Sequence, residues 1–499
     1  MKLKRLTDSL PECRICGSVD KDVKTIVYHS DKAIPESLFF AVDGHLEDGK
    51  KYIEKAIENG ARTIVMSEGK TENLPQDITQ DITTVETSDV RKAMAQISDA
   101  FYNHPSQRLL VIGVTGTKGK TSVTFMIRSI LEAAGIKTGI IGTVFNGYEE
   151  HMTDAFATTP QSPDIQKLMA EMEDAGCKAV VMEVSSQGLM HSRVENIDFD
   201  IGVFTNISPD HIGDGEHSNF EEYLFWKKTL FSKCRRAVIN CDDPWHEYMV
   251  KDENLEQVVY FGETEKADFC SFNHGLVTDG GRLGISYDLK SKKPCGDDSV
   301  RHISINLAGD FNIQNTLSAI AVTKSLGIPW SIIEETISNV KVPGRVEKID
   351  ISDDFTVLVD YAHNGVALKS LLKSLRKYEP QRLMLVFGCG GNRDRNRRFE
   401  MAKAAMETAD FIIVTSDNPR REQPQKIIDD ITSRMKFCDK VIMAIPDRQK
   451  AIQRVIAEAK RGDIVVVAGK GHETYQIIGD EIRHFDDKKV ILSCRRGLK

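Results

Sequence analysis

Gly113-Val-Thr-Gly-Thr-Lys-Gly-Lys-Thr-Ser122 joins an apolar, β-branched run at residues 109–114 to an amphipathic run at residues 120–134. The first run predicts a strand and the second a helix. Glycines between them let the backbone wrap a polyphosphate, and the start of the helix adds positive potential. Lys120 can then reach the β- and γ-phosphates, and the Thr121 hydroxyl can bind Mg²⁺. The expected ATP-binding residues of this loop are Gly116, Thr117, Lys118, Gly119, Lys120, Thr121 and Ser122.

The loop departs at one position from the strict phosphate-loop pattern G-x-x-x-x-G-K-[ST]. Val114 occupies the first glycine position, and Gly116 comes two residues later. A glycine-rich turn without a ligand would also join a strand to a helix. The Gly-Lys-Thr-Ser ending at residues 119–122 favours ATP binding over that simpler interpretation.

Short apolar strands alternate with helices along most of the chain after residue 108. Such alternation predicts mostly parallel sheets that helices cover on both faces. Residues 255–310 alternate with period 2 in places, which predicts an antiparallel patch. The expected strands are residues 109–114, 138–144, 179–183, 201–205, 237–240, 356–359, 382–387, 411–415 and 464–468, and the expected helices are residues 120–134, 161–175, 220–231, 312–326, 365–378, 399–407 and 424–435.

The beginning of the chain has a mixed pattern. Strands are expected at residues 37–42 and 61–66, a helix at residues 48–59 and a polar loop at residues 67–90. At about 150 residues per domain, a chain of 499 residues holds roughly three domains. We therefore predict an α/β protein with three domains: a small N-terminal mixed α/β domain at residues 1–105, a central P-loop ATPase-like parallel-sheet domain at 106–343 and a C-terminal Rossmann-like α/β domain at 344–499.

The composition is ordinary for a soluble globular protein, with 40% hydrophobic and 28% charged residues. A formal net charge of −8 speaks against a dedicated nucleic-acid-binding protein. The first 13 residues are basic at the start but lack an apolar stretch, so no signal peptide is expected. Apolar runs such as residues 463–468 are too short to span a membrane. Ten scattered cysteines suit free thiols in the cytoplasm.

Polar residues follow the expected strands nearest the phosphate loop. Glu183 ends the strand at residues 179–183, and Asn206, Asp210 and His211 follow the next strand. Open α/β sheets place ligands at the carboxyl ends of their strands, so these groups are expected beside the loop. A carboxylate there can help to hold Mg²⁺. Each residue alone is more often a plain surface or loop residue, but their shared position beside the phosphate loop favours function.

Further motifs continue along the chain after the loop T-G-T-K-G-K-T-S. Together they resemble the Mur ligase family over nearly the whole chain, least clearly in the first ~100 residues. The last two resemble the MurE type, which adds the third amino acid of the peptidoglycan stem peptide. The motifs are T-T-P at residues 158–160, E-V-S-S at 183–186, N-I-S-P-D-H at 206–211, P-G-R-V-E at 343–347, D-Y-A-H at 360–363, G-C-G-G-N-R-D at 388–394, D-N-P-R at 417–420 and G-K-G-H-E at 469–473.

The resemblance implies a cytoplasmic, ATP-dependent ligase of peptidoglycan synthesis, and hence of cell-wall biogenesis, cell shape and cell division. The γ-phosphate of ATP passes to a carboxylate of UDP-N-acetylmuramoyl-L-Ala-D-Glu, and an amino acid attacks the resulting acyl phosphate. Lysine and Mg²⁺ offset the charge of the two anions. The implied ligands are ATP, Mg²⁺, the UDP-muramoyl dipeptide and an amino acid. Neither nucleic acid nor membrane is an expected partner, and the chain is expected to be a monomer.

The resemblance also implies the catalytic residues, which are Lys120, Glu183, His211 and Lys227. Lys227 matches the family's carbamylated lysine, N6-carboxylysine, in which a carbamate supplies an anionic oxygen ligand. Lys228 is the alternative if the register differs by one residue. The implied metal ligands are Thr121, Glu183, His211 and Lys227, and the further ATP contacts are Asn315, Arg345, Asp360 and His363.

Two further residue sets follow from the resemblance. The muramoyl-peptide contacts are Ser30, Thr158, Thr159, Ser185 and Arg193, and the amino-acid contacts are Arg393, Asp417, Asn418, Arg420, Gly469 and Glu473. Arginine can bond a free carboxylate bidentately and Glu473 can pair with an ammonium, which suits a zwitterion. In the family, D-N-P-R accompanies meso-diaminopimelate, whose distal carboxylate Arg420 would meet.

The sequence departs from the family pattern at three places. The uridine motif Asp-Ser-Arg reads His29-Ser30-Asp31, and Gln187 stands where the family often has histidine. Residues 210–220 are longer than the common form by about two residues, as in lysine-adding relatives. One alternative therefore keeps the chemistry with L-lysine or another diamine. More distant alternatives are a folylpolyglutamate-synthetase-like ligase and a non-catalytic nucleotide-binding paralogue.

Overall fold

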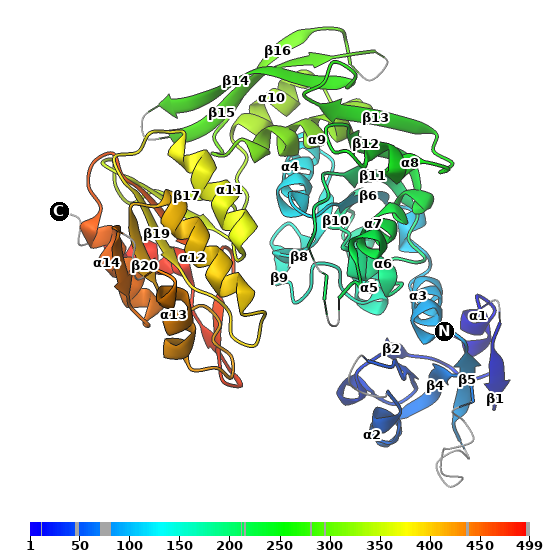
Figure 1. Cartoon of the computed structure of the whole chain (residues 1–499). Coiled ribbons are helices and arrows are strands. Elements are labelled where there is room, and N and C mark those ends of the chain that lie inside the picture. Colours follow the sequence, from blue (N-terminus) through cyan, green and yellow to red (C-terminus); the bar gives the residue numbers. More distant parts are fainter. Residues whose placement is uncertain are drawn as a thin grey trace. The chain divides into compact units, whose positions relative to one another are not determined.

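The computed structural model describes residues 1–10, 12–44, 49–69, 81–210, 212–213, 216–279, 282–293, 296–435 and 439–495. The chain forms two compact units (Figure 1). The first contains Met1–Phe261 and Ala321–Leu326, and the second contains Gly262–Ile320 and Gly327–Lys499. Parallel sheets with covering helices occur in both units, which confirms the α/β prediction. The domain boundaries at residues 105 and 343 stay predictions.

The N-terminal sheet of the first unit has the strand order β1-β5-β4-β3-β2, with β1 antiparallel and the other strands parallel. Apolar side chains of α1 and α3 pack on one face, and those of α2 pack on the other. The elements are α1 Leu3–Thr7, β1 Arg14–Cys16, β2 Thr25–Val27, η1 Ser30–Lys32, β3 Ser37–Phe40, η2 Gly49–Tyr52, α2 Ile53–Glu58, β4 Ala61–Ser67, β5 Thr83–Thr87 and α3 Val90–Phe101.

The loop predicted at residues 67–90 is wrong in one part, because it contains β5. This strand, Thr83-Thr-Val-Glu-Thr87, is fully buried between β1 and β4. Its threonines count as polar in a composition reading, yet their β-branched side chains favour the extended backbone. The neighbouring strands bury this segment and stabilise it as a strand, and the local sequence pattern does not indicate that burial.

The central sheet of the first unit has the order β13-β12-β11-β6-β10-β7-β8-β9. Strands from β13 to β7 are parallel, and β8 and β9 continue antiparallel. α4 packs on one face, whereas α5, α7 and α8 contribute to the core on the other. The elements are η4 Pro105–Gln107, β6 Leu110–Thr115, α4 Lys120–Ala133, β7 Thr138–Ile141, β8 Phe145–Tyr148, β9 His151–Asp154, α5 Ser162–Asp174, β10 Ala179–Glu183, α6 Ser186–Met190, β11 Phe199–Phe204, α7 Phe220–Lys228, η5 Phe231–Lys233, β12 Cys234–Asn240, α8 His246–Val250 and β13 Gln257–Gly262.

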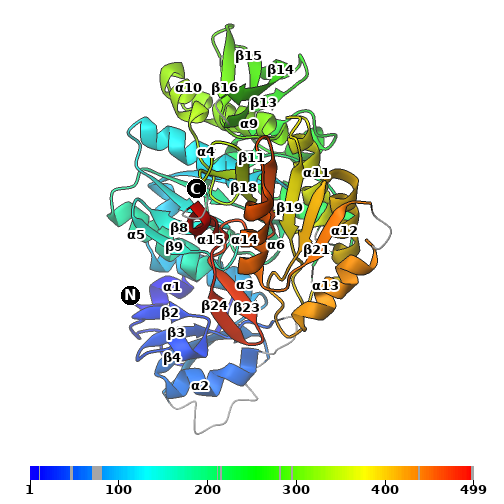
Figure 2. The same ribbon diagram turned by 90° about the vertical axis from the view of Figure 1, so that its left-hand side faces the viewer.

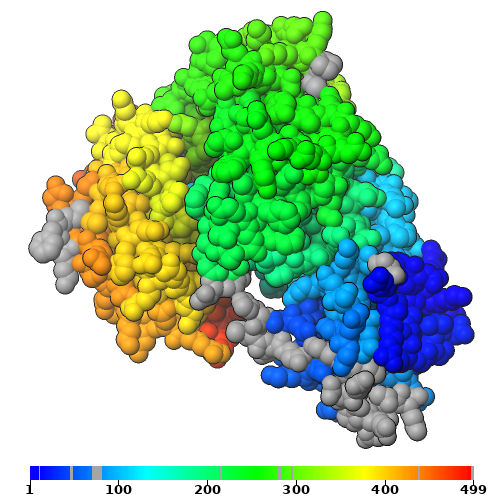
Figure 3. Space-filling view, turned by 45° about the vertical axis from the view of Figure 1, so that its right-hand side comes forward, coloured from blue at the N-terminus to red at the C-terminus, as the bar shows by residue number. Residues whose placement is uncertain are grey.

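The N-terminal sheet and the central sheet are joined within the first unit. α3 packs beside α5, and the Tyr28 hydroxyl donates a hydrogen bond to Asp164 at the start of α5. In the space-filling view, the blue N-terminal residues border the cyan residues of the same unit (Figure 3). The N-terminal sheet therefore has a direct polar anchor on the helix that follows the T-T-P motif.

The second unit begins with the antiparallel strands β14, β15 and β16, as the period-2 pattern predicts. Its main sheet has the order β17-β18-β22-β19-β20-β21, parallel except for β17. The elements are β14 Phe269–Asp279, β15 Arg282–Ser291, β16 Val300–Ile305, α9 Phe311–Ser325, α10 Trp330–Ser338, β17 Glu347–Ile349, β18 Thr356–Asp360, α11 Gly365–Arg376, β19 Leu383–Phe387, α12 Asn396–Thr408, β20 Phe411–Val414, α13 Pro424–Ser433, β21 Val441–Ala444, α14 Arg448–Glu458, β22 Ile464–Ala468, β23 Tyr475–Ile478, β24 Glu481–His484 and α15 Asp487–Cys494.

Helices cover both faces of this main sheet. Apolar residues of α11, α12 and α13 form the core on one face, and those of α14 and α15 form the core on the other (Figure 2). The predicted strand at residues 464–468 is the central strand β22, which is buried along its whole length. This arrangement confirms the Rossmann-like prediction for the C-terminal part.

The core between α11 and the main sheet offers a test of this packing. Leu372→Ala removes a side chain that is 0% exposed. We expect it to lower the free energy of unfolding of the second unit by about 2–5 kcal/mol, measured by urea denaturation of the full chain. Val366→Ala, on the same helix but 65% exposed, is the control and should change stability by at most about 0.5 kcal/mol. Equal effects of the two changes would contradict the packing.

Candidate functional site

Two lysines converge on one backbone carbonyl in the phosphate loop. Lys120 Nζ donates to the Gly116 oxygen at 2.8 Å, and Lys227 Nζ donates to the same oxygen at 2.9 Å. Gly116 has φ +148°, and a Cβ there would lie 2.0 Å from Thr205 Oγ1. The loop therefore requires glycine at this position and places two lysine side chains where a polyphosphate would bind.

Lys227 reaches the loop from the last turn of α7. Asn219 caps the start of this helix, because its side chain accepts a hydrogen bond from the Glu222 N–H. The Lys227 side chain is 1% exposed and lies 4.7 Å from the centre of the Tyr223 ring. Burial, and then the nearby Lys120 ammonium, lower the pKa of Lys227 well below its ordinary value. The amine therefore loses its proton more readily than an exposed lysine does.

Glu183 lies at the carboxyl end of β10 beside the start of α4. Its Oε2 accepts from the hydroxyls of Thr121 at 3.1 Å and Thr143 at 3.0 Å, and its Oε1 accepts from the Thr143 N–H at 2.8 Å. Glu183 is 1% exposed. Thr121 and Glu183, both predicted metal ligands, thus form one buried oxygen cluster. Thr143 was not predicted as a site residue, although it lies within the strand expected at residues 138–144, of which β7 forms the first part.

The residues that directly follow β11 form hydrogen bonds with the backbone of the phosphate loop. Asn206 accepts from the Lys118 N–H at 3.0 Å and donates to the Lys118 carbonyl at 3.1 Å. The Thr205 hydroxyl donates to the same carbonyl at 2.7 Å. Thr117 shares a hydrogen bond of 2.9 Å with the Tyr223 hydroxyl. The expected placement of the N-I-S-P motif beside the loop is therefore found in the structure.

Four of the predicted muramoyl-peptide contacts lie together next to Glu183. The Thr159 hydroxyl donates to the Glu183 carbonyl at 3.0 Å and lies 3.1 Å from Ser185 Oγ. Arg193 donates to the Thr159 carbonyl at 2.7 Å, and Thr158 lies 3.1 Å from Thr143 in the Glu183 cluster. The peptide contacts and the oxygen cluster are therefore continuous.

Two further predicted residues remain to be considered. Ser30 is buried in η1 of the N-terminal sheet, where its carbonyl accepts from Asn59 at 3.0 Å. His211, predicted as a ligand of a second metal ion, lies outside the described residues. The roles of both residues stay predictions.

A cationic cluster lies where α3 approaches the end of α6. Arg91 and Arg193 are both half-buried, and their charges act on His191. Burial, and then Arg91, Arg193 and His217, lower the pKa of His191 to about 4. This concentration of positive charge next to the Thr159 and Ser185 side chains suits an anionic substrate.

Three predicted motifs meet within the second unit. A Cβ on Gly344 would lie 2.2 Å from the His472 backbone nitrogen, so the P-G-R-V-E loop packs directly on the G-K-G-H-E loop. The Arg345 guanidinium lies 4.6 Å from the centre of the Tyr361 ring. Asp360 accepts from the Val346 and Ala362 N–H groups, each at 2.8 Å. Burial raises the pKa of Asp360, and Arg345 opposes that rise.

Two further residues were predicted to contact ATP, and each of them lies within hydrogen-bonding distance of another group of the protein. His363 is exposed, and its Nδ1 lies 3.0 Å from the Tyr361 carbonyl. Asn315 is buried on α9, where its amide donates to Asn312 Oδ1 at 2.9 Å. Their roles toward ATP stay predictions.

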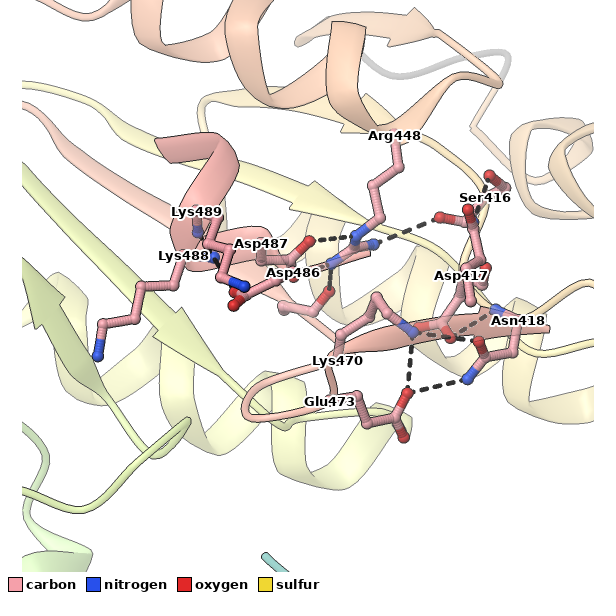
Figure 4. Close-up of polar contacts among 12 residues, drawn as sticks. Ser416, Asp417, Asn418, Arg448, Lys470, Glu473, Asp486, Asp487, Lys488 and Lys489 are labelled. Carbon is pink, nitrogen blue, oxygen red and sulfur yellow. Dashed lines mark hydrogen bonds and ion pairs between the residues drawn. The ribbon is translucent and has the colours of Figure 1, made fainter. Parts of the chain in front are cut away.

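A charged group joins the D-N-P-R and G-K-G-H-E loops (Figure 4). Lys470 Nζ, 0% exposed, donates to Asn418 Oδ1 at 3.1 Å and to Glu473 Oε2 at 2.9 Å. Asn418 Nδ2 donates to the same Glu473 oxygen at 2.9 Å. Lys470 was not predicted as a site residue, although it stands inside a quoted motif. Its buried ammonium orients both predicted amino-acid contacts.

Arg420 projects toward the G-C-G-G-N-R-D loop. Its Nη1 donates to the Gly391 carbonyl at 3.0 Å. A Cβ on Gly390 would lie 2.8 Å from that nitrogen and 3.8 Å from Arg393 Cγ, so the two arginines flank the same glycine. Arg420 itself has φ +51°, a left-handed conformation that its backbone bonds with Ile477 and Gly479 hold in place. The Arg420 guanidinium and the Arg393 side chain thus lie at the same glycine of this loop.

The two loops also touch through Asp417 and Gly469. Gly469 has φ +111°, and a Cβ there would lie 2.6 Å from Asp417 Oδ2. Asp417 accepts from the Asn418 N–H at 2.6 Å. Asp417, Asn418, Gly469 and Glu473, all predicted amino-acid contacts, therefore form one contiguous group.

Comparison with known proteins assigns this arrangement to a family. The Mur ligase middle domain matches residues 114–323, the Mur ligase glutamate ligase domain matches residues 344–471, and the Mur ligase catalytic domain matches residues 22–102. The UDP-N-acetylmuramoyl-L-alanyl-D-glutamate–2,6-diaminopimelate ligase of Caldanaerobacter subterraneus is 39% identical, covering 98% of each chain. The chain belongs to the Mur ligase family. The predicted family and the predicted ligase activity are confirmed.

Other relatives agree with this assignment. The ligase of the same name from Geobacillus thermodenitrificans is 39% identical over 98% of each chain. A solved structure of a ligase with this name has a TM-score of 0.68 and 28% identity, covering 99% of this Mur ligase and 98% of that chain. A folylpolyglutamate synthase of Mycobacterium tuberculosis has a TM-score of 0.60 at 17% identity and covers 77% of this chain and 92% of its own, which shows a shared fold.

The depressed pKa of His191 makes the stability of this Mur ligase depend on pH. Since the folded-state pKa of about 4 lies below the ordinary value of 6.5, His191 contributes stability above pH 6.5 that is lost as the pH falls toward 4. His191→Gln should therefore flatten the fall in Tm over this range. His151→Gln, at an exposed residue of β9, is the control and should leave the slope unchanged. Equal slopes for wild type and His191→Gln would contradict the assignment.

Proposed function

We propose that this Mur ligase joins meso-diaminopimelate to UDP-N-acetylmuramoyl-L-Ala-D-Glu at the expense of ATP. The main observation behind this proposal is the group of opposite charges in the second unit. Glu473 beside Lys470 and Asn418 offers an anion for a substrate ammonium, and Arg420 beside Arg393 offers cations for a carboxylate. A diamino diacid presents both kinds of group at its distal end. The names of relatives at 39% identity agree with this substrate.

ATP is proposed to bind the loop at residues 116–122, with Lys120 facing its phosphates. Mg²⁺ prefers oxygen ligands and usually keeps several waters, so one or two protein groups are enough to hold it. Thr121 and Glu183 meet this requirement, because a hydroxyl and a buried carboxylate lie 3.1 Å apart there. Bound Mg²⁺ would neutralise phosphate charge. Among the residues that the structure describes, no group of three or more His, Cys, Asp and Glu side chains gathers around a metal position.

The proposed reaction has two steps. The D-Glu side-chain carboxylate attacks the γ-phosphorus of ATP, and the bond to the β-phosphate breaks, giving an acyl phosphate and ADP. The amino group of the incoming amino acid then attacks the acyl carbon, loses a proton, and phosphate leaves with the electrons of the broken C–O bond. Lys120 and the cationic cluster of Arg91 and Arg193 keep the two anions near each other in the first step.

Lys227 is proposed to be carbamylated in the working enzyme. Its lowered pKa favours the neutral amine, which is the form that attacks CO₂ and then releases a proton. The resulting carbamate keeps one N–H, which can still donate to the Gly116 carbonyl now 2.9 Å away. The new negative charge would lie near the Lys120 ammonium and attract it. Carbamylation thus turns a pair of amines into a pair of opposite charges.

The remaining proposals concern the setting of the enzyme. None of the described helices is long and apolar enough to cross a membrane. We propose that the enzyme is a monomer and that it works in the cytoplasm, where UDP-linked precursors and ATP are available. Its pathway would be peptidoglycan synthesis.

Lys227→Ala tests the carbamate. We expect loss of amino-acid-dependent ADP release by roughly 10²–10³-fold, with partial rescue by added short-chain carboxylates that replace the anionic oxygen. Lys228→Ala is the matched control, because Lys228 pairs with Glu253 at 3.2 Å away from the loop. Density for a bare ammonium at Lys227 in a high-resolution map with ATP and Mg²⁺ bound would overturn the assignment. Inactive Lys228→Ala with active Lys227→Ala would move the site by one residue.

Arg420→Ala tests the amino acid. Wild-type enzyme should favour meso-diaminopimelate over L-lysine by at least about tenfold in kcat/KM, because lysine leaves the arginine without its carboxylate. Arg420→Ala should lose most activity with diaminopimelate and narrow this ratio, in a coupled ADP-release assay with UDP-N-acetylmuramoyl-L-Ala-D-Glu. Arg421→Ala is the control, since Arg421 is 76% exposed and pairs with Asp480. Wild-type preference for L-lysine would refute the proposed substrate and favour the long 210–220 segment as the specificity marker.

A further inference from the structure

Arg448 lies deep in the second unit at the first residue of α14. Its side chain is 0% exposed and forms a two-pronged ion pair with Asp487 of α15. Nε donates to Oδ1 and Nη2 donates to Oδ2, each at 2.7 Å (Figure 4). Asp487 is also 0% exposed, so each charge depends on the other for compensation.

The same guanidinium also donates to two backbone carbonyls, which lie at or just after the ends of two separate strands. Nη2 donates to the Ala468 carbonyl at 3.0 Å, and Nη1 donates to the Ser416 carbonyl at 3.4 Å. Ala468 is the last residue of β22, and Ser416 comes two residues after β20. One planar group therefore joins two chain segments that are not neighbours in the sheet, since β19 lies between them.

These two carbonyls immediately precede the loops of the proposed amino-acid site. Asp417 follows Ser416, and Gly469 follows Ala468. The loops then pack without spare room, because a Cβ on Gly469 would already lie 2.6 Å from Asp417 Oδ2. A change in the separation of the two strand ends would therefore reach the Asn418 and Glu473 side chains.

We propose that Arg448, oriented by Asp487, is a positioning residue for the amino-acid site. It contacts no proposed substrate group, and it acts by setting the separation between the D-N-P-R and G-K-G-H-E loops. This inference rests on the proposed function of those loops. Displacement of a binding group by about 1 Å can cost up to ~10²-fold in rate, so the positioning has a measurable consequence.

Arg382 provides a matched control. It pairs with Asp463 with Nη2···Oδ2 at 2.5 Å, and it donates to the Glu458 carbonyl at 2.7 Å. Arg382 precedes β19 and Asp463 precedes β22, so this second arginine–aspartate pair lies at the amino ends of two neighbouring strands of the same sheet. Loss of its fork should affect the stability of the sheet without moving the loops at the carboxyl ends.

The experiment compares Arg448→Lys with Arg382→Lys in the full chain. Lysine keeps the positive charge but lacks the planar fork and has only three N–H donors, so it cannot replace all four hydrogen bonds of Arg448. We expect Arg448→Lys to raise the KM for diaminopimelate about tenfold or more, with the KM for ATP within about twofold of wild type. Arg382→Lys should leave both constants within about twofold while lowering Tm. Asp487→Asn is a second variant and should also raise the KM for diaminopimelate.

The possible outcomes distinguish failure of the positioning role from failure of the proposed function. Unchanged KM for diaminopimelate in Arg448→Lys, or an equal rise in Arg382→Lys, overturns the positioning role. Failure of both Arg448→Lys and Asp487→Asn to fold also overturns it, because the pair would then serve stability alone. Absence of activity in wild-type enzyme with every diamine would instead refute the proposed function.

Discussion

The convergence of Lys120 and Lys227 on the Gly116 carbonyl is the interaction on which the first unit depends. Two amines that meet at one oxygen repel each other when both are protonated, and burial together with the Lys120 charge lowers the pKa of Lys227. The loop can form only because Gly116 accepts φ +148° against Thr205. The positions of Glu183 and Asn206 follow from this loop, since β10 and β11 are the strands that flank β6.

The second unit meets a different electrostatic requirement. Its loops bring Glu473 and Lys470 into contact and place Arg420 beside Gly391, so charges of both signs lie close together. Lys470 is 0% exposed, and a buried cation of this kind is stable only when its partners are fixed. The same reasoning applies to Arg448 with Asp487. Buried ion pairs thus lie beneath or within these loops, and the more accessible arginines are the proposed contacts for a ligand.

Much of the fold was accessible from local pattern. Apolar β-branched runs predicted β6, β10, β18 and β22 to within about one residue, because strands buried on both faces are apolar throughout. β5 was missed because its buried threonines look polar, and β21 was missed because its residues are partly or fully exposed. α14 was also missed, although its buried apolar residues recur at helical spacing. The N-terminal sheet was the least predictable part, since its short strands gain their stability from neighbours distant in sequence.

The sequence by itself determined the chemistry of the protein: a glycine–lysine phosphate loop, carboxylates after strands and the ordered motifs that show a Mur ligase. Those features depend on residue type and spacing, which the sequence states directly. Only the tertiary structure decided which groups meet, namely Thr143 with Glu183, Tyr223 with Thr117, Lys470 with Asn418, and Arg448 with the ends of two strands. These contacts join residues from 20 to more than 100 positions apart along the chain. They arise because parallel strands bring distant loops to one edge of a sheet, where burial fixes the charge and orientation of each side chain.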